Sequence, residues 1–148
     1  MNHFYLVISS LFFNFPLLFF FSKVERYSRL SKDFLQKNKM ECILAGLLFL
    51  NLILSSFFWI NPIPYNGIHI LDGIFGKISL LLFSIYILFH KKIGITRKIV
   101  FLCILGLGLF LFYYSNKYSR EDWCCDEHVF YHFIFHVMIA SGCSLSFI

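Results

Sequence analysis

Long apolar runs alternate with short polar segments along the chain. Five such runs lie at about 4–22, 41–60, 70–90, 98–115 and 128–148. A helix that crosses a hydrocarbon layer of about 30 Å needs roughly twenty apolar residues. Open sheet edges are not tolerated in lipid, and the chain has no alternating pattern typical of a membrane barrel. The pattern predicts an all-α integral membrane bundle of about five transmembrane helices, with residues 1–148 forming a single polytopic domain.

Two local features refine this prediction. The first run has neither a basic amino-terminal region nor a small-residue cleavage site, which favours a retained helix over a signal peptide. Asn14 and Pro16 lie inside it and predict a local kink, because proline removes a backbone hydrogen bond. The sequence NPIP at 61–64 ends the second run.

Composition supports a membrane protein. The 148 residues are 59% hydrophobic and only 14% charged, and they include 21 phenylalanines. Soluble domains carry about 25% charged residues. The five cysteines show no C-x-x-C spacing, and Cys124 and Cys125 are neighbours.

The formal charge of +5 is concentrated in two of the four connections. The loop 61–69 has no lysine or arginine, and 116–127 has only Lys117 and Arg120. The positive-inside rule then places the amino terminus outside or in a lumen and the carboxyl terminus in the cytoplasm. The basic residues therefore indicate the topology of the chain. The predicted partner is a lipid bilayer and not a nucleic acid. The connections between the first two runs and between the third and fourth runs contain Lys23, Arg26, Arg29, Lys32, Lys37, Lys39, Lys91, Lys92, Arg97 and Lys98.

A few ionisable or hydroxyl side chains lie within the apolar runs. Such groups cost a few kcal/mol each to insert, so each is a candidate functional residue. The predicted topology brings one set to the same membrane level from three helices. This set consists of Ser55, Ser56, His69, Asp72, His128, His132 and His136.

Histidines four apart on a helix place their rings on one side, where two of them can bind the same metal ion. Either His132 with His136 or His128 with His132 has this spacing. A hydrolytic zinc ion needs three protein ligands and a bound water, which a carboxylate or a hydroxyl can orient. The structural alternative is that His69 and His128 are interfacial residues, that Asp72 only begins a helix, and that the serines serve helix packing.

Two segments resemble one membrane family. YHFIFHVMIASG is similar to the last helix of the seven-helix membrane hydrolase superfamily of alkaline ceramidases, adiponectin-type receptors and TMEM8-like proteins. SSFFWINPIPYNGIHILDGIFG resembles the second-to-third-helix region of that family. The resemblance covers roughly residues 50–148. It implies zinc binding by His132 and His136, with Asp72 and either Ser55 or Ser56 beside the metal, and hydrolysis of a ceramide-like lipid amide.

Two departures from the family pattern stand out. The third zinc ligand of the family follows its serine by four residues, where this chain has Trp59 or Ile60. His69 and His128 are the candidates to replace it. The family also has three helices between its aspartate helix and its final helix, where this chain has one. A non-catalytic relative or a small assembly subunit with structural histidines is therefore the alternative function. A bis-histidine haem protein is disfavoured, because its histidines must face each other across the bundle.

Overall fold

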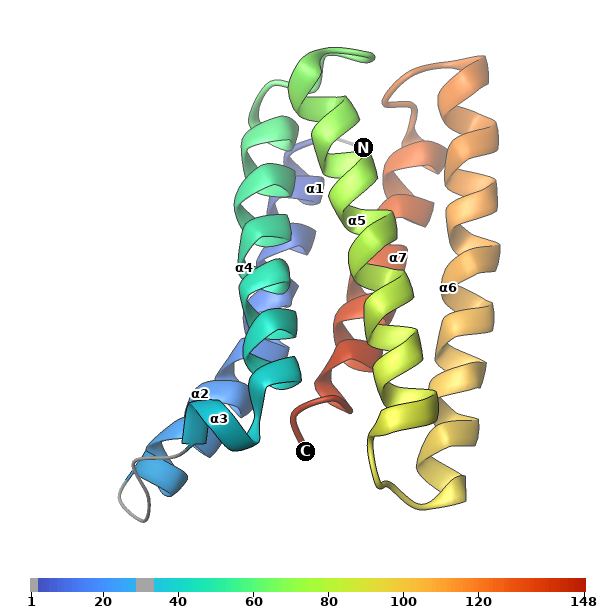
Figure 1. Ribbon diagram of the computed structural model, residues 1–148. Helices are drawn as coiled ribbons and strands as arrows, with labels where there is room; N and C mark the ends of the chain where they lie inside the picture. The colour runs from blue at the N-terminus through green and yellow to red at the C-terminus, as the bar shows by residue number, and fades with distance from the viewer. Residues whose placement is uncertain (1–2, 29–33) are drawn as a thin grey trace.

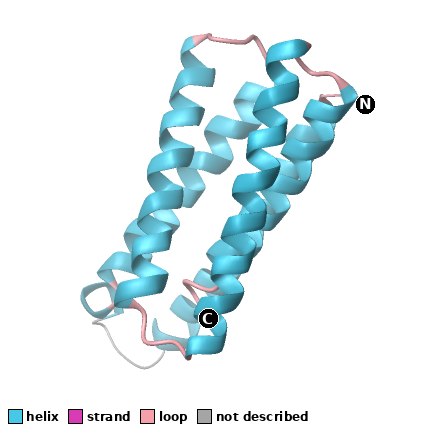
Figure 2. Cartoon of the chain, turned by 90° about the vertical axis from the view of Figure 1, so that its right-hand side faces the viewer, coloured by secondary structure: helices cyan, strands magenta, loops and turns pink. Residues whose placement is uncertain are grey.

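The computed structural model describes residues 3–28 and 34–148. Arg29 and Lys32 of the basic connection lie outside the described residues. The described part consists of helices joined by short loops, as Figure 2 shows, and it contains no strand. Its helical segments are α1 (Phe4–Ser10), η1 (Leu11–Phe13), α2 (Asn14–Ser28), α3 (Phe34–Lys37), α4 (Lys39–Ile60), α5 (Gly67–Ile85), η2 (Tyr86–His90), α6 (Ile95–Glu121) and α7 (Asp126–Ser144).

The predicted all-α bundle of about five long helices is confirmed. Four of the helices in the described part are long and apolar enough to cross a membrane. Many of their large apolar side chains point away from the bundle, as expected for a surface in contact with lipid. The four spans are Phe4–Tyr27, Lys39–Ile60, Gly67–His90 and Ile95–Glu121.

Some helix bounds differ from the prediction. The helix α6 continues to Glu121, six residues beyond the end of the apolar run, because polar residues outside the hydrocarbon layer can continue a helix. The last helix ends at Ser144 instead of 148. The short helix α3 was not predicted. Before Pro16, the first span changes to 3-10 geometry over Leu11–Phe13, close to the predicted kink.

The helix α7 is the long helix that is not among the four candidate spans, and it lies among the other helices. It packs along α6 and also contacts α1 and α2, whereas α5 packs mainly along α4 (Figure 1). The connections 61–66 and 122–125 lie at the end of the bundle that also holds the start of α1, here called the amino end. The α5–α6 connection and the carboxyl terminus lie at the opposite, carboxyl end. The surrounding helices therefore shield the histidines of α7.

Glycines allow α6 and α7 to approach closely. A β-carbon added to Gly108 would lie 2.8 Å from Cδ1 of Ile139, and one added to Gly142 would lie 3.2 Å from Cγ2 of Ile104. By contrast, a β-carbon on Gly106 would meet no atom within 4 Å. Small residues at such crossings are typical of helix pairs in membranes.

This contact yields a first prediction. Gly108→Val should destabilise the bundle by about 1–3 kcal/mol, because the added branches overlap the end of the Ile139 side chain, which must shift within the packed contact of α6 and α7. The matched control is Gly106→Val, which places the same side chain in open space on the same helix. Unfolding by dodecyl sulfate, followed by circular dichroism, would measure both. Equal loss of stability in the two variants would contradict the close packing at Gly108.

The core has two parts. The larger one fills the carboxyl half with aromatic and aliphatic side chains from α2, α4, α5, α7 and the residues after α7, including Phe20, Leu44, Phe83 and Phe147. The smaller one lies at the amino end and contains Leu6, Phe58, Trp59 and Val129. The smaller cluster adjoins the histidines of α7.

Candidate functional site

The three histidines of α7 form a ladder along one side of the helix. The ring centres of His128 and His132 are 5.8 Å apart, and those of His132 and His136 are 4.6 Å apart. His128 and His136 are buried, and His132 is half-buried. The predicted placement of the three rings on one side of the last helix is therefore confirmed. We call this set the histidine ladder.

Serines from two other helices contact the rings of His132 and His136. Ser9 Oγ of α1 lies 2.8 Å from Nδ1 of His136, and Ser115 Oγ of α6 lies 2.9 Å from Nδ1 of His132. Both serines are fully buried. Sequence reasoning missed them, and the only signal available was a hydroxyl within an apolar run.

The Ser9 contacts determine which nitrogen of His136 carries the proton. Ser9 Oγ also lies 2.9 Å from the carbonyl oxygen of Leu6, which can only accept a hydrogen bond. A hydroxyl has one proton, so Ser9 donates to Leu6 and accepts from Nδ1–H of His136. Nε2 of His136 then keeps its lone pair. This is the tautomer in which a histidine binds a metal through Nε2.

His128 and His69 have the opposite arrangement. Nδ1 of His128 accepts from the backbone N–H of Cys124 at 3.2 Å, and Nδ1 of His69 accepts from the backbone N–H of Tyr65 at 2.9 Å. A neutral imidazole that accepts at Nδ1 carries its proton on Nε2. Neither ring therefore has a free lone pair for a metal in this arrangement. His69 lies close to the ladder and His128 belongs to it, but both are poor candidates for the third ligand.

Aromatic rings enclose the amino end of the ladder. The indole of Trp59 is buried, and its ring centre lies 5.0 Å from that of His132 and 5.9 Å from that of His128. The ring of Trp123 lies 5.0 Å from that of His128 and 5.2 Å from that of His69, and its Nε1 donates to the carbonyl oxygen of Pro62. His69 from α5 and His128 from α7 thus approach the same indole. Nε1 of Trp59 has no hydrogen-bond partner among the described residues.

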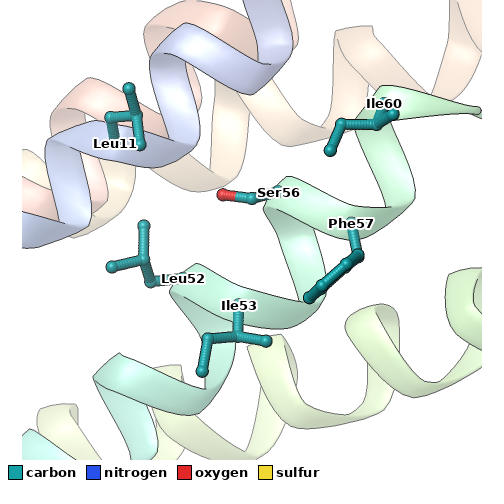
Figure 3. A pocket seen from close by; sticks show the side chains of 6 residues that line it. All are labelled: Leu11, Leu52, Ile53, Ser56, Phe57 and Ile60. Carbon is teal, nitrogen blue, oxygen red and sulfur yellow. The ribbon is translucent and has the colours of Figure 1, made fainter.

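The two predicted serines of α4 point to different places. Ser55 Oγ lies 2.9 Å from Ser10 Oγ, and Ser10 donates to the same Leu6 carbonyl that Ser9 uses. Ser55 is thereby linked to His136 through a buried polar chain. Ser56 instead faces an apolar pocket of 210 Å³ on another side of α4 (Figure 3). That pocket is lined by Leu11, Leu52, Ile53, Ser56, Phe57 and Ile60, and no histidine contributes to it.

Asp72 lies on α5 less than one turn beyond His69, so it belongs to the amino half of the bundle as predicted. It is half-buried and has no hydrogen bond or ion pair with any residue that the structure describes. The position of Asp72 beside the metal thus stays a prediction that no contact in the structure supports.

The spacing of the two rings that the resemblance implies as zinc ligands matches that of a zinc site. A tetrahedral zinc ion with Zn–N bonds of about 2.0–2.1 Å holds two imidazole centres about 5 Å apart. The 4.6 Å between His132 and His136 is close to this value. Over residues 3–28 and 34–148, however, no three histidine, cysteine or acidic side chains are grouped so that they could hold a metal ion. Burial raises the pKa of the Cys124 thiol to about 11, with Cys125 and Asp122 adding to the effect, so this nearby thiol is protonated at neutral pH.

No protein-family model matches the sequence, and comparisons with curated proteins and with solved structures give no match. The site therefore has to be interpreted from its own geometry.

Proposed function

We propose that this chain is a multi-pass membrane protein that binds zinc through Nε2 of His132 and His136, as a relative of the zinc-dependent lipid-amide hydrolases that it resembles. The observation that carries the proposal is the hydrogen bond between Ser9 and His136. It fixes the tautomer of His136 whose Nε2 is free, and the buried Ser115 holds the ring of His132 through Nδ1. A ceramide-like lipid is the proposed substrate class.

The proposed orientation has the amino terminus outside or in a lumen and the carboxyl terminus in the cytoplasm. Basic residues at the carboxyl end support it, with Lys91, Lys92, Arg97 and Lys98 around the α5–α6 connection. The histidine ladder then begins at the outer or lumenal surface. Its zinc ion would meet lipids of that leaflet.

The metal content of the purified protein tests this proposal. We expect wild-type protein in mild detergent, dialysed against zinc, to retain the metal, and His132→Ala or His136→Ala to lose most of it, because either change leaves one imidazole. The control is His90→Ala, which removes an exposed histidine at the other end of the bundle. Mass spectrometry of the metal measures the difference. Zinc content that is zero in the wild type, or equal in all variants, would contradict the proposal.

A second candidate function has its own observation. Trp59 follows Ser55 by four residues, where the family has its third zinc ligand, and its indole packs against His132. The alternative is a non-catalytic membrane protein whose ladder is a structural network of histidines, serines and indoles. Release of fatty acid from a fluorescent short-chain ceramide distinguishes the two. Turnover that depends on His132 and His136 would exclude the non-catalytic alternative.

A further inference from the structure

The helix α5 carries two charged side chains that the bundle leaves without partners. Lys77 is exposed near the middle of the span Gly67–His90, and Asp72 is half-buried five residues earlier. Neither has a hydrogen bond or ion pair with another described residue. An unpaired ionisable group at this depth is costly and marks a functional position. Asp72 and Lys77 cannot form an ion pair within one chain, because residues five apart on one helix do not face each other.

The surface between these two residues is open. A β-carbon added to Gly73 or to Gly76 would meet no atom within 4 Å. On a helix of 3.6 residues per turn, both glycines lie between Asp72 on one flank and Lys77 on the other. Farther along the same side, Phe83 and Ile87 are fully buried in the bundle. This side of α5 is thus covered by other parts of the same chain in the carboxyl half of the span, and it is uncovered in the amino half.

The positions match the seam of a parallel helix pair. If Gly73 takes the first heptad position (a), then Gly76 takes the fourth (d) and Asp72 takes the preceding g position. Lys77 then takes the e position. In a parallel pair, a g residue on one helix lies beside the following e residue on the other, and opposite charges there form interhelical ion pairs. Glycine at a and d allows close approach of the backbones.

We propose that two copies of this chain associate through the amino half of α5, as a parallel pair related by a two-fold axis. Lys77 of each copy pairs with Asp72 of the other, so the axis produces two ion pairs across the glycine surface. A lipid headgroup does not fit this surface as well, because Lys77 lies near the middle of the span, below the level of the headgroups. The proposal is independent of zinc, because neither residue binds the ladder.

A charge exchange tests the pairing. The full chain would carry a donor or an acceptor fluorophore at its amino terminus and be mixed in phosphatidylcholine vesicles, with energy transfer measured against dilution in lipid. We expect wild type to associate, and Lys77→Asp or Asp72→Lys to weaken the association roughly tenfold, because each places like charges opposite one another. The double variant, which exchanges the two charges, should regain most of the association.

The controls separate pairing from misfolding. Gly76→Leu should weaken association by holding the helices apart, whereas Gly106→Leu places the same side chain on an open surface of α6 and should not. Circular dichroism checks that each variant is helical. A monomeric wild type, unchanged association in both single-charge variants, or a double variant no better than the single ones would overturn the proposal. If copies of wild type do not associate but the protein captures a different membrane protein through α5, the two-copy proposal is equally wrong.

Discussion

Replacing Glu41 with alanine is expected to destabilise the folded bundle by about 3–5 kcal/mol, because the change leaves two lysines at a buried site without their carboxylate. Glu41 is buried in the first turn of α4. Its Oε2 lies 2.6 Å from Nζ of Lys23, and its Oε1 accepts from Nζ of Lys91 at 3.2 Å and from the hydroxyl of Tyr86 at 2.9 Å. Removing one partner of such a network costs more than the network contributes as a whole.

The position of Glu41 explains why the effect should extend through the bundle. Its three partners come from α2, from η2 and from the residue that follows η2. Lys91 also donates to the carbonyl oxygen of Ser146, just beyond α7. One carboxylate therefore ties together, at the carboxyl end of the bundle, four segments that are far apart in the sequence. The positions of these four segments relative to one another at this end depend on Glu41.

The control for this prediction is Glu121→Ala, which removes an exposed carboxylate at the end of α6 and should change stability by less than about 0.5 kcal/mol. Unfolding in mixed micelles of dodecyl sulfate, followed by circular dichroism, measures both variants. Burial lowers the pKa of Lys91, with Glu41 opposing this effect. In Glu41→Ala, this carboxylate no longer counteracts the effect of burial on the pKa of Lys91. A stability for Glu41→Ala equal to that of the control would refute the structural role of this network.

The helices and the ladder could be predicted because their signals are local. Runs of apolar residues set the lengths of the spans, and the four-residue spacing of His128, His132 and His136 fixes their common side whatever surrounds the helix. The partners of these rings depend on how the other helices are rotated about their axes. Ser9 and Ser115 are ordinary hydroxyls within apolar runs, and no spacing relates them to α7.

The same reasoning explains which contacts of the candidate site could not be predicted. Ser55 and Ser56 are neighbours, but they point about 100° apart around α4, so only one can face the ladder. The packing of α4 against α1 directs Ser55 to Ser10 and leaves Ser56 in the apolar pocket. Asp72 lies at the predicted end of the bundle, but the rotation of α5 determines what it contacts. Depth in a membrane can be read from the sequence, whereas rotation depends on tertiary packing.

The largest gain in zinc binding is expected from Trp59→His. The substitution places a third imidazole at the position where the resembled family has its third ligand, and Trp59 now contacts the rings of both His132 and His128. Three protein ligands with one open position form the usual catalytic zinc site. Because loss of a supporting residue alone changes metal affinity 10–100-fold, a new direct ligand should raise zinc affinity by roughly 100-fold or more.

The matched control is Trp59→Phe, which also shortens the side chain but adds no ligand. Both variants lose part of the buried indole and should be less stable without metal, at a cost of about 1–4 kcal/mol. Zinc should stabilise Trp59→His much more than Trp59→Phe, because a metal that binds the folded state more tightly stabilises it more. Competition with a chromophoric chelator gives the affinities, and thermal unfolding with and without zinc gives the stabilities. If Trp59→His folds but binds zinc no better than Trp59→Phe, then Trp59 does not occupy a ligand position, and the ladder is a structural network of hydrogen-bonded rings.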